Sequence, residues 1–394
     1  MTATLRLLAR HRGGLLVLIL AAAIACARGL YVAPGRTWPN LLLNGLYVTS
    51  LSVSAMFFLA SQRLCGARWS AGLRRIPEAL MLAIPVCAAL MLAVFPGRGW
   101  IFPWSRPGAF AHAPAIAGKV VYLNTPFVFA RMVAVLGLWI AFAAGFRRAS
   151  LAQDQSPGSS LSWHRRMNCY AALFVLAFAI SFTVGSFDWI SSLDSDWFST
   201  VFAIYVFAGT FVQGVAAITL AVVTLRRREP LRYLVTERHL HDLGKMLFAF
   251  STFWAYIWVC QYLLIWYVDI PDEVTHYVKR TSGPWVLLFA LNLVVNWIVP
   301  FLTLLPARAK TNPNRLKLVS LLLLFGHWLD LYMLLIPSVS SAPRIGFEEV
   351  LLAAGYMALF YLLFIRSLAR APLVPVNDPV LAADLRYRAL GGEQ

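Results

Sequence analysis

Charged residues are scarce in this sequence. Only 13% of its 394 residues are Asp, Glu, Lys or Arg, whereas 60% are hydrophobic, and the mean hydropathy is +0.70. A soluble domain of this length could not bury so much apolar surface, so the composition excludes a water-soluble globular protein. Acidic residues are the scarcer kind, 17 against 34 basic residues, and the formal net charge is +17.

Cysteine is also rare, and its spacing matches no cofactor motif. The five cysteines are scattered, without CxxC or CxxCH: Cys26, Cys65, Cys87, Cys169 and Cys260. This spacing argues against an iron–sulfur cluster or an attached c-type haem. Only His327 lies deep in an apolar run, whereas a membrane b-type haem needs two axial ligands at matched depth. We expect this chain to bind no metal and no cofactor, with quinone as the one candidate ligand.

Apolar runs long enough to cross a membrane are abundant. About 20 residues at 1.5 Å each cross a hydrocarbon core of roughly 30 Å. Ten such runs occur, near 14–33, 41–62, 76–95, 122–146, 167–187, 198–225, 240–268, 284–306, 316–336 and 346–366. Lipid offers the backbone no hydrogen-bond partners, and the short alternating segments of a β-barrel are not visible, so the runs must be helices. The sequence predicts an all-α integral membrane protein with one membrane domain over 1–370 and a cytoplasmic tail over 371–394.

The basic residues are distributed unevenly between the predicted loops. If the N-terminus is cytoplasmic, most of the 34 basic residues fall in cytoplasmic segments. This is the positive-inside pattern with both termini inside, so the basicity sets topology and attracts anionic lipid rather than nucleic acid. The first run ends in AAAIACARG, which resembles the end of a signal peptide, but the charge pattern favours a retained helix. The polar stretch 147–166 is interpreted as a flexible cytoplasmic hinge.

Polar residues at membrane depth are the candidate functional residues, because they are costly in lipid and usually face a bundle interior or a water path. His327 and Asp330 lie three residues apart in LLLLFGHWLDLYM and share one face of a helix. Histidine titrates near neutral pH, and a neighbouring carboxylate stabilises its charged form. A proton path is therefore predicted through His241, Asp242, Lys245, His327, Asp330, Asn296 and Arg131. A purely structural hydrogen-bond network is the alternative.

Two long segments resemble a known family. SFDWISSLDSDWFSTVFAIYVFAGTF (186–211) and HDLGKMLFAFSTFWAYIWVCQYLLIWYVDIPDE (241–273) are similar to the integral membrane F subunit of bacterial alternative complex III, a quinol:cytochrome c oxidoreductase. That subunit belongs to the polysulfide-reductase (NrfD-like) membrane-anchor family. The match continues in order through YLNTPFVFARMV (122–133), PWVLLFALNLVVNWIVPFL (284–302) and GHWLDLYML (326–334).

The resemblance implies an architecture and a role. Predicted helices two to five and six to nine would form two four-helix bundles, with helices one and ten peripheral. The chain would lie in the bacterial cytoplasmic (inner) membrane and pair with a homologous quinol-oxidising membrane subunit. It would sit beneath a periplasmic iron–sulfur protein and multihaem cytochrome subunits of the respiratory chain. Its own part would be scaffolding and proton conduction, without a redox centre.

Two alternative functions remain open. Quinone could bind this subunit in its own right, with Arg131, Asn124 and Gln261 around the head group. A secondary transporter is the alternative of another class, because ten helices with charges near the membrane midplane permit it. Transporters often break paired helices with Gly or Pro at the site, and the interior prolines Pro85 and Pro300 do not stand out as such a pair.

Overall fold

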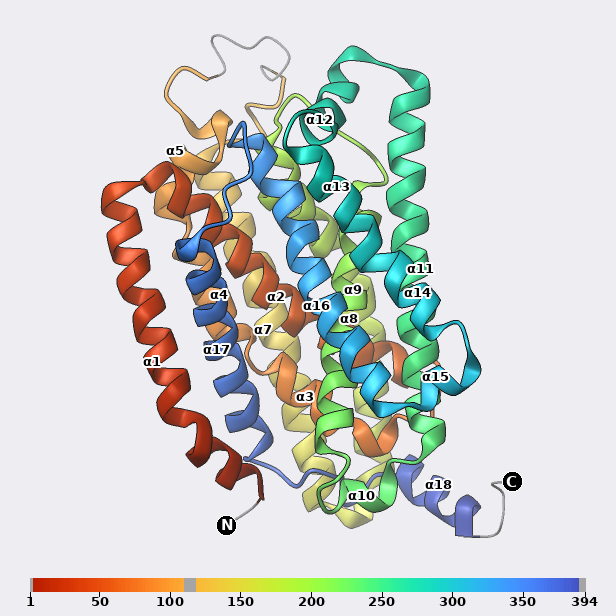
Figure 1. Ribbon diagram of the computed structural model, residues 1–394. Helices are drawn as coiled ribbons and strands as arrows, with labels where there is room; N and C mark the ends of the chain where they lie inside the picture. The colour runs from red at the N-terminus through yellow and green to blue at the C-terminus, as the bar shows by residue number, and fades with distance from the viewer. Residues whose placement is uncertain (1–2, 110–117, 390–394) are drawn as a thin grey trace.

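The structure is a computed structural model that describes residues 3–109 and 118–389. Within these ranges it contains no strands and ten helical segments that are long and apolar enough to span a membrane, which confirms the predicted fold class. The spans are α1 (Ala3–Val32), α2 (Pro34–Leu64), α3 with α4 (Arg75–Met81, Ile84–Leu92), α7 (Thr125–Gln155), α8 (Ser160–Trp189), α9 (Phe202–Leu225), α11 (Glu237–Val268), α13 with α14 (Trp285–Leu293, Val299–Leu304), α16 (Pro313–Leu335) and α17 (Phe347–Leu368). They run side by side along one direction (Figure 1).

Shorter helices and turns join the spans. The short α-helices are α5 (Arg98–Ile101), α10 (Leu231–Leu234), α12 (Pro271–Thr281), α15 (Ala307–Thr311) and α18 (Pro379–Ala389). Single 3₁₀ turns lie at Ala71–Leu73, Phe95–Gly97, Pro103–Ser105, Pro157–Ser159, Ser191–Leu193 and Ile336–Ser338. A π-helical turn, Val294–Ile298, joins α13 to α14. Of the predicted tail, 371–389 is described and ends in α18, and 390–394 lies outside the described residues.

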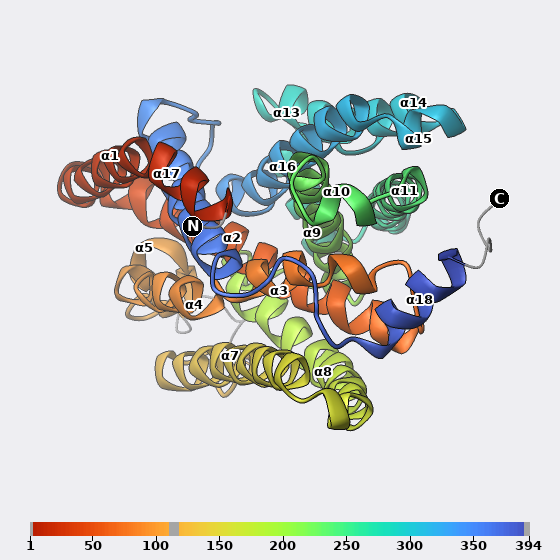
Figure 2. The same ribbon diagram turned by 90° about the horizontal axis from the view of Figure 1, so that it is seen from below.

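The spans form two groups, which Figure 2 shows from one end. The first bundle holds α2, α3–α4, α7 and α8, and the second holds α9, α11, α13–α14 and α16. The two bundles meet where α2 packs on α9, and these are the most buried spans. α1 and α17 pack on each other at the periphery, and α1 is the least buried span. This arrangement matches the two predicted bundles with peripheral first and tenth helices.

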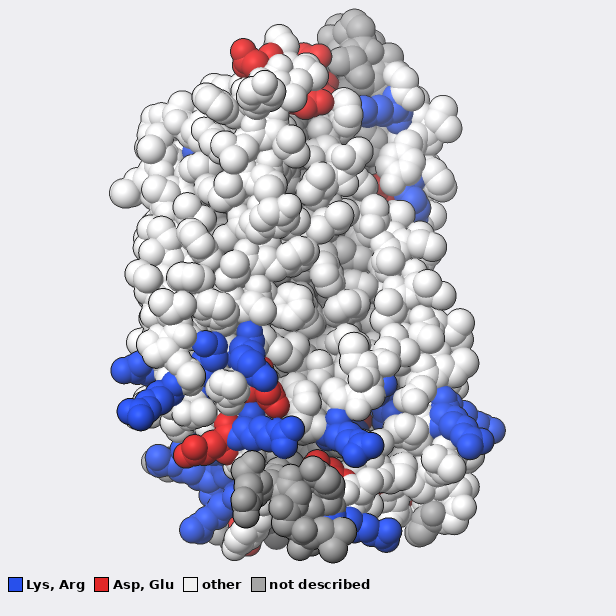
Figure 3. Space-filling view, turned by 90° about the vertical axis from the view of Figure 1, so that its right-hand side faces the viewer, with Lys and Arg blue, Asp and Glu red and all other residues white. Residues whose placement is uncertain are grey.

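The two ends of the molecule differ in charge. On the face in Figure 3, Lys and Arg gather at the end where Figure 1 places the start of α1 and the tail helix α18, and we call this the basic end. A broad band without charges separates it from the opposite end, where Asp and Glu appear together with a few Lys and Arg. An uncharged band between charged ends is the surface that a polytopic membrane protein requires, because charges are costly in hydrocarbon.

The structure of 147–166 differs from the predicted flexible hinge, because most of this stretch is helical. α7 continues to Gln155 and α8 begins at Ser160, so only Ser156 and the 3₁₀ turn Pro157–Ser159 separate the two α-helices. Residues near this end of α7 are buried and bonded: Gln153 Oε1 accepts a hydrogen bond from Arg74 at 2.7 Å, and Asp154 accepts one from Arg75. Polar composition therefore marked the end of the apolar run and not the end of the helix.

Two spans are interrupted beside prolines. The third span is divided at Leu82–Ala83, just ahead of Pro85, and the eighth turns π-helical just ahead of Pro300. Pro300 has no N–H to donate to the carbonyl of Asn296, and its ring crowds that carbonyl, which favours a wider turn. Each of the two spans nevertheless remains one helical segment, so the prolines mark local changes of helix geometry and not a complete break.

Candidate functional site

A carboxylate lies at the centre of the second bundle. Asp330 of α16 is 1% exposed. Its Oδ1 accepts hydrogen bonds from Asn292 Nδ2 at 2.8 Å and from the Tyr205 hydroxyl, and its Oδ2 accepts one from Trp254 Nε1 at 3.1 Å. These donors belong to α13, α9 and α11, so the four spans of the second bundle meet at this side chain. Neutral donors, rather than Lys or Arg, hold the carboxylate.

His327 lies one turn before Asp330 and is 2% exposed. Its Nδ1 is 3.9 Å from Asp330 Oδ2, which is too long for a hydrogen bond. Neither ring nitrogen has a hydrogen-bond partner among the residues that the structure describes. α9 approaches the ring through Gly209, where a Cβ would lie 2.8 Å from Nδ1. The imidazole is thus held beside the carboxylate, with nitrogens available to a proton or a water molecule.

Two amides extend this cluster along the π-helical turn. Asn296 Nδ2 donates to Asn292 Oδ1 at 2.8 Å and to the Gly326 carbonyl at 3.0 Å. The turn and α16 approach closely there, because a Cβ on Gly326 would lie 2.4 Å from Asn296 Oδ1. Since Asn292 donates in turn to Asp330, the structure brings Asn296 into the cluster of His327 and Asp330.

Polar groups of α2 and α9 adjoin His327 on the side of the first bundle. The ring of Tyr47 stacks on His327 with centroids 6.2 Å apart, and its hydroxyl donates to the Leu324 carbonyl at 2.8 Å. Gln213 Nε2 donates to the Tyr47 carbonyl at 3.1 Å, and Ser50 Oγ donates to Gln213 Oε1 at 2.6 Å. Four buried hydroxyls on α2, α9 and α16 lack a hydrogen-bond partner within the described ranges, those of Thr49, Ser54, Thr219 and Ser320. Buried polar atoms of this kind are usual positions for ordered water.

The predicted group at the start of α11 lies apart from this cluster. Asp242 and Lys245 form an ion pair at 2.7 Å, and the Lys245 side chain is 55% exposed. His241 is partly buried beside them. The residue of α11 that reaches Asp330 is Trp254, more than two helical turns past Lys245, or about 13 Å along the helix. The structure therefore places these three residues near the basic end and not against the buried carboxylate.

Arg131 is engaged within the first bundle. Its Nε and Nη2 donate to the two carboxylate oxygens of Asp188 at 2.7 and 3.0 Å, and both Nη atoms donate to the Tyr122 carbonyl at 3.1 Å. The guanidinium also lies 3.8 Å from the ring centroid of Tyr122 and 4.3 Å from that of Phe127. Arg131 thus neutralises a buried aspartate on α8, and it lies in a different bundle from Asp330.

The residues predicted around a quinone head group do not line one pocket. Asn124 caps α7, the helix that carries Arg131, by accepting a hydrogen bond from Phe127 N at 3.0 Å. Gln261 is buried on α11, and its Oε1 has no hydrogen-bond partner in the described part of the chain. Figure 2 shows α7 and α11 in different bundles. The structure therefore does not bring Arg131 and Asn124 together with Gln261.

A second ionic cluster lies outside the spans, at the end opposite the basic end. Asp194 accepts hydrogen bonds from His276 at 2.8 Å, Lys279 at 3.0 Å and Ser338 at 2.8 Å, and Arg280 lies 3.4 Å away. Burial alone would raise the pKa of Asp194, but the hydrogen bond from His276 and the charge of Arg280 outweigh it and hold that pKa well below its usual range. The carboxylate stays charged at neutral pH and fastens α12 to the end of α16.

Some members of these clusters were not predicted from the sequence. Tyr205 and Trp254 donate to the central carboxylate, but both lie in aromatic-rich apolar runs, where most such residues are core or interfacial. His276 lies between the predicted runs 240–268 and 284–306, and no spacing in the sequence links it to Asp194. The position of Asp194 in an acidic cluster was the only signal of that site in the sequence.

Fold and site together define a multi-pass, all-α membrane protein whose core holds a carboxylate beside an imidazole. No protein-family model matches this chain, and no curated protein matches it. The feature of this chain that points to a function is the buried polar cluster within the second bundle.

Proposed function

We propose that this chain is a membrane subunit of a bacterial quinol-oxidising respiratory complex of the alternative complex III type, where it anchors partner subunits and conducts protons. The similarity of segments 186–211 and 241–273 to the NrfD-like membrane anchors supports this type of complex. The charge distribution supports a topology in which the basic end, with both termini, faces the cytoplasm across the inner membrane. In this complex the redox centres belong to the partners: a homologous quinol-oxidising membrane subunit, a periplasmic iron–sulfur protein and multihaem cytochromes.

The observation that carries proton conduction is the pairing of Asp330 with His327 deep in the bundle. A buried carboxylate held by neutral donors is a costly arrangement, and an apolar side chain would fill the same space without that cost. The imidazole 3.9 Å away has nitrogens without hydrogen-bond partners in the described structure. One water molecule or a small rotation of the ring suffices to pass a proton between the two groups.

Buried hydroxyls support a route to this pair from the basic end. Ser54, Thr219 and Ser320 lie between His327 and the basic ends of α2, α9 and α16. Ser320 precedes His327 by about two helical turns, or roughly 10 Å. Ordered water between such groups can relay protons, so the proposed route follows these three helices instead of the start of α11. The Tyr205 hydroxyl, from the other end of α9, is the next group beyond Asp330.

Replacing Asp330 with asparagine in the reconstituted complex tests this function. We expect Asp330→Asn to assemble, because asparagine has the same shape, and to lose most proton translocation per quinol oxidised. Asp272→Asn, at an exposed carboxylate of α12, is the matched control and should translocate protons as the wild type does. His327→Gln gives an independent variant if the first one does not assemble. Unchanged proton stoichiometry in an assembled variant of either residue would contradict the proposal.

A further inference from the structure

A pocket of about 310 Å³ opens at the basic end, between the end of α2, the start of α8 and the tail helix α18. Its polar walls are strongly basic, and they include Arg63, Arg68, Arg74 and His164. Apolar side chains form much of the remaining wall, among them Phe58, Leu59, Pro77 and Leu161. The pocket therefore combines several positive charges with an apolar surface at the level where a transmembrane span ends.

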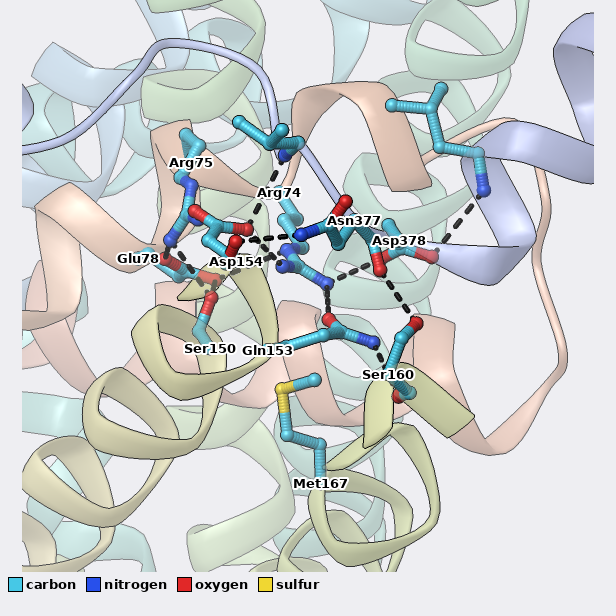
Figure 4. A network of polar contacts seen from close by, with 12 residues as sticks. Arg74, Arg75, Glu78, Ser150, Gln153, Asp154, Ser160, Met167, Asn377 and Asp378 are labelled. Atoms are coloured by element: carbon cyan, nitrogen blue, oxygen red, sulfur yellow. Dashed lines mark hydrogen bonds and ion pairs between the residues drawn. The ribbon is translucent and has the colours of Figure 1, made fainter. Parts of the chain in front are cut away.

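The only carboxylate on these walls, within the described residues, is already paired. Asp378 accepts a hydrogen bond from Arg74, and its other oxygen accepts one from Val380 N at 2.8 Å (Figure 4). The preceding residue fixes the tail to the bundle: Asn377 Nδ2 donates to the Asp154 carbonyl at 2.7 Å. The tail segment is thus a built wall of the pocket, and its carboxylate is directed at Arg74 rather than at the other cations.

The ionic network behind this wall balances its own charge. It contains three arginines, Arg74, Arg75 and Arg147, and three carboxylates, Glu78, Asp154 and Asp378. Each member forms an ion pair with another member, and Figure 4 shows how closely most of them lie. The three carboxylates of this network are balanced by its three arginines. They therefore provide no excess negative charge for the other arginines that line the pocket.

Arg63 and Arg68 are those further arginines. Arg63 donates to Asn168 Oδ1 at 3.0 Å and to Met167 Sδ at 3.3 Å, and both acceptors are neutral. Neither Arg63 nor Arg68 forms an ion pair with a carboxylate of the described chain. His164 adds a buried Nδ1 without a hydrogen-bond partner in the same part of the chain. The pocket therefore offers uncompensated positive charge and an unused polar atom.

We infer that this pocket binds a phosphate-bearing anion, with Arg63 and Arg68 as its ligands. Guanidinium groups match phosphate oxygens in geometry and charge, and a cavity of this size accommodates a small head group. The apolar wall beside the basic one fits the glycerol and first methylenes of an anionic phospholipid, whose head group lies at this depth. A soluble phosphate compound shares the recognition chemistry. Because Pro379, Val380 and Ala383 of the tail line the pocket, an occupant packed against them also shields this segment of the chain.

Native mass spectrometry of the purified protein in detergent tests this inference. Two variants change the proposed ligands: the double variant Arg63→Gln/Arg68→Gln and the single variant Arg68→Gln, at an exposed arginine. The matched control is Arg165→Gln, at an exposed arginine of α8. The probes are phosphatidylglycerol in mixed micelles and, separately, inorganic phosphate. We expect wild type and control to retain one phosphatidylglycerol, the double variant at least tenfold less, and the single variant an intermediate amount.

A second readout reports on the tail. Trypsin cleavage at Arg386 of α18 should be faster in the double variant than in the control, because an unfilled pocket no longer shields that segment. Protection by inorganic phosphate without retained lipid would support the same site with a soluble ligand. Equal lipid retention and equal phosphate response in all proteins would overturn the inference. Because these readouts need neither partners nor turnover, they do not depend on the proposed respiratory function.

Discussion

Replacing Arg75 tests how the buried ionic network stabilises the basic end of the first bundle. The Arg75 side chain is 1% exposed, and it donates to Glu78 at 2.6 Å, to Ser150 at 2.8 Å and to Asp154. Methionine has a similar length but no charge, so Arg75→Met leaves two buried carboxylates with one cation fewer. Breaking a buried pair by removing one partner costs about 3–5 kcal/mol.

The structure indicates the lower part of this range. Arg147 lies 3.0 Å from Glu78, and Arg74 lies 3.5 Å from it, so the carboxylate keeps two cations. We expect Arg75→Met to lower the free energy of unfolding by about 3 kcal/mol, roughly a hundredfold in the folding equilibrium. Glu78→Gln in the same chain restores the charge balance. The double variant should therefore be less destabilised than the sum of the single variants by about 1 kcal/mol or more.

Denaturant unfolding in detergent, followed by tryptophan fluorescence, measures these differences. Arg165→Met is the control, because this arginine is exposed on α8 near the same end, and it should change stability by less than about 0.5 kcal/mol. A stability loss in Arg75→Met no larger than that of the control would refute a stabilising role for the network. It would also be refuted if the effects of Arg75→Met and Glu78→Gln simply add.

Three further predictions concern the buried cluster and the opposite end. Tyr205→Phe removes a donor to the central carboxylate and should cost about 1.5–3 kcal/mol by the same unfolding assay, and no loss of stability would contradict that contact. Gly209→Val should displace His327 and lower proton translocation, whereas Gly137→Ala, with open space around its Cβ, should not. The pKa of Asp194 is lower in the folded protein than its unfolded value of about 3.9. The resulting stabilisation of the fold is therefore complete above that value and is lost as pH falls towards the folded pKa. Asp194→Asn should therefore melt lower than wild type at neutral pH, with a difference that shrinks below about pH 4, and a difference independent of pH would refute this.

The spans were predictable from the sequence because each needs a run of apolar residues as long as the membrane is thick. Helix ends were less predictable, because a helix that leaves the hydrocarbon keeps its backbone hydrogen bonds while its side chains become polar. The continuation of α7 to Gln155 is an example, since its last turns are held by Arg74 and Arg75 from a distant segment. Hydropathy contains no information about such contacts.

The candidate site was predictable only in part. His327, Asp330 and Asn296 stand out in the sequence because polar groups at depth are rare. Periodicity shows which residues share a helix face, but not which helix that face meets, so the donors Tyr205 and Trp254 were not found. For the same reason the sequence joined distant polar residues into one path, whereas the structure separates them between two bundles and two ends.

We propose that Asp330 gains and loses a proton during turnover of the proposed respiratory complex. Infrared difference spectroscopy of the reconstituted complex during quinol oxidation observes this directly through the carbonyl band of a protonated carboxylic acid. We expect a band that is present in wild type and in Asp272→Asn and absent in Asp330→Asn. A carboxylic acid difference spectrum that is the same in Asp330→Asn as in wild type would contradict it.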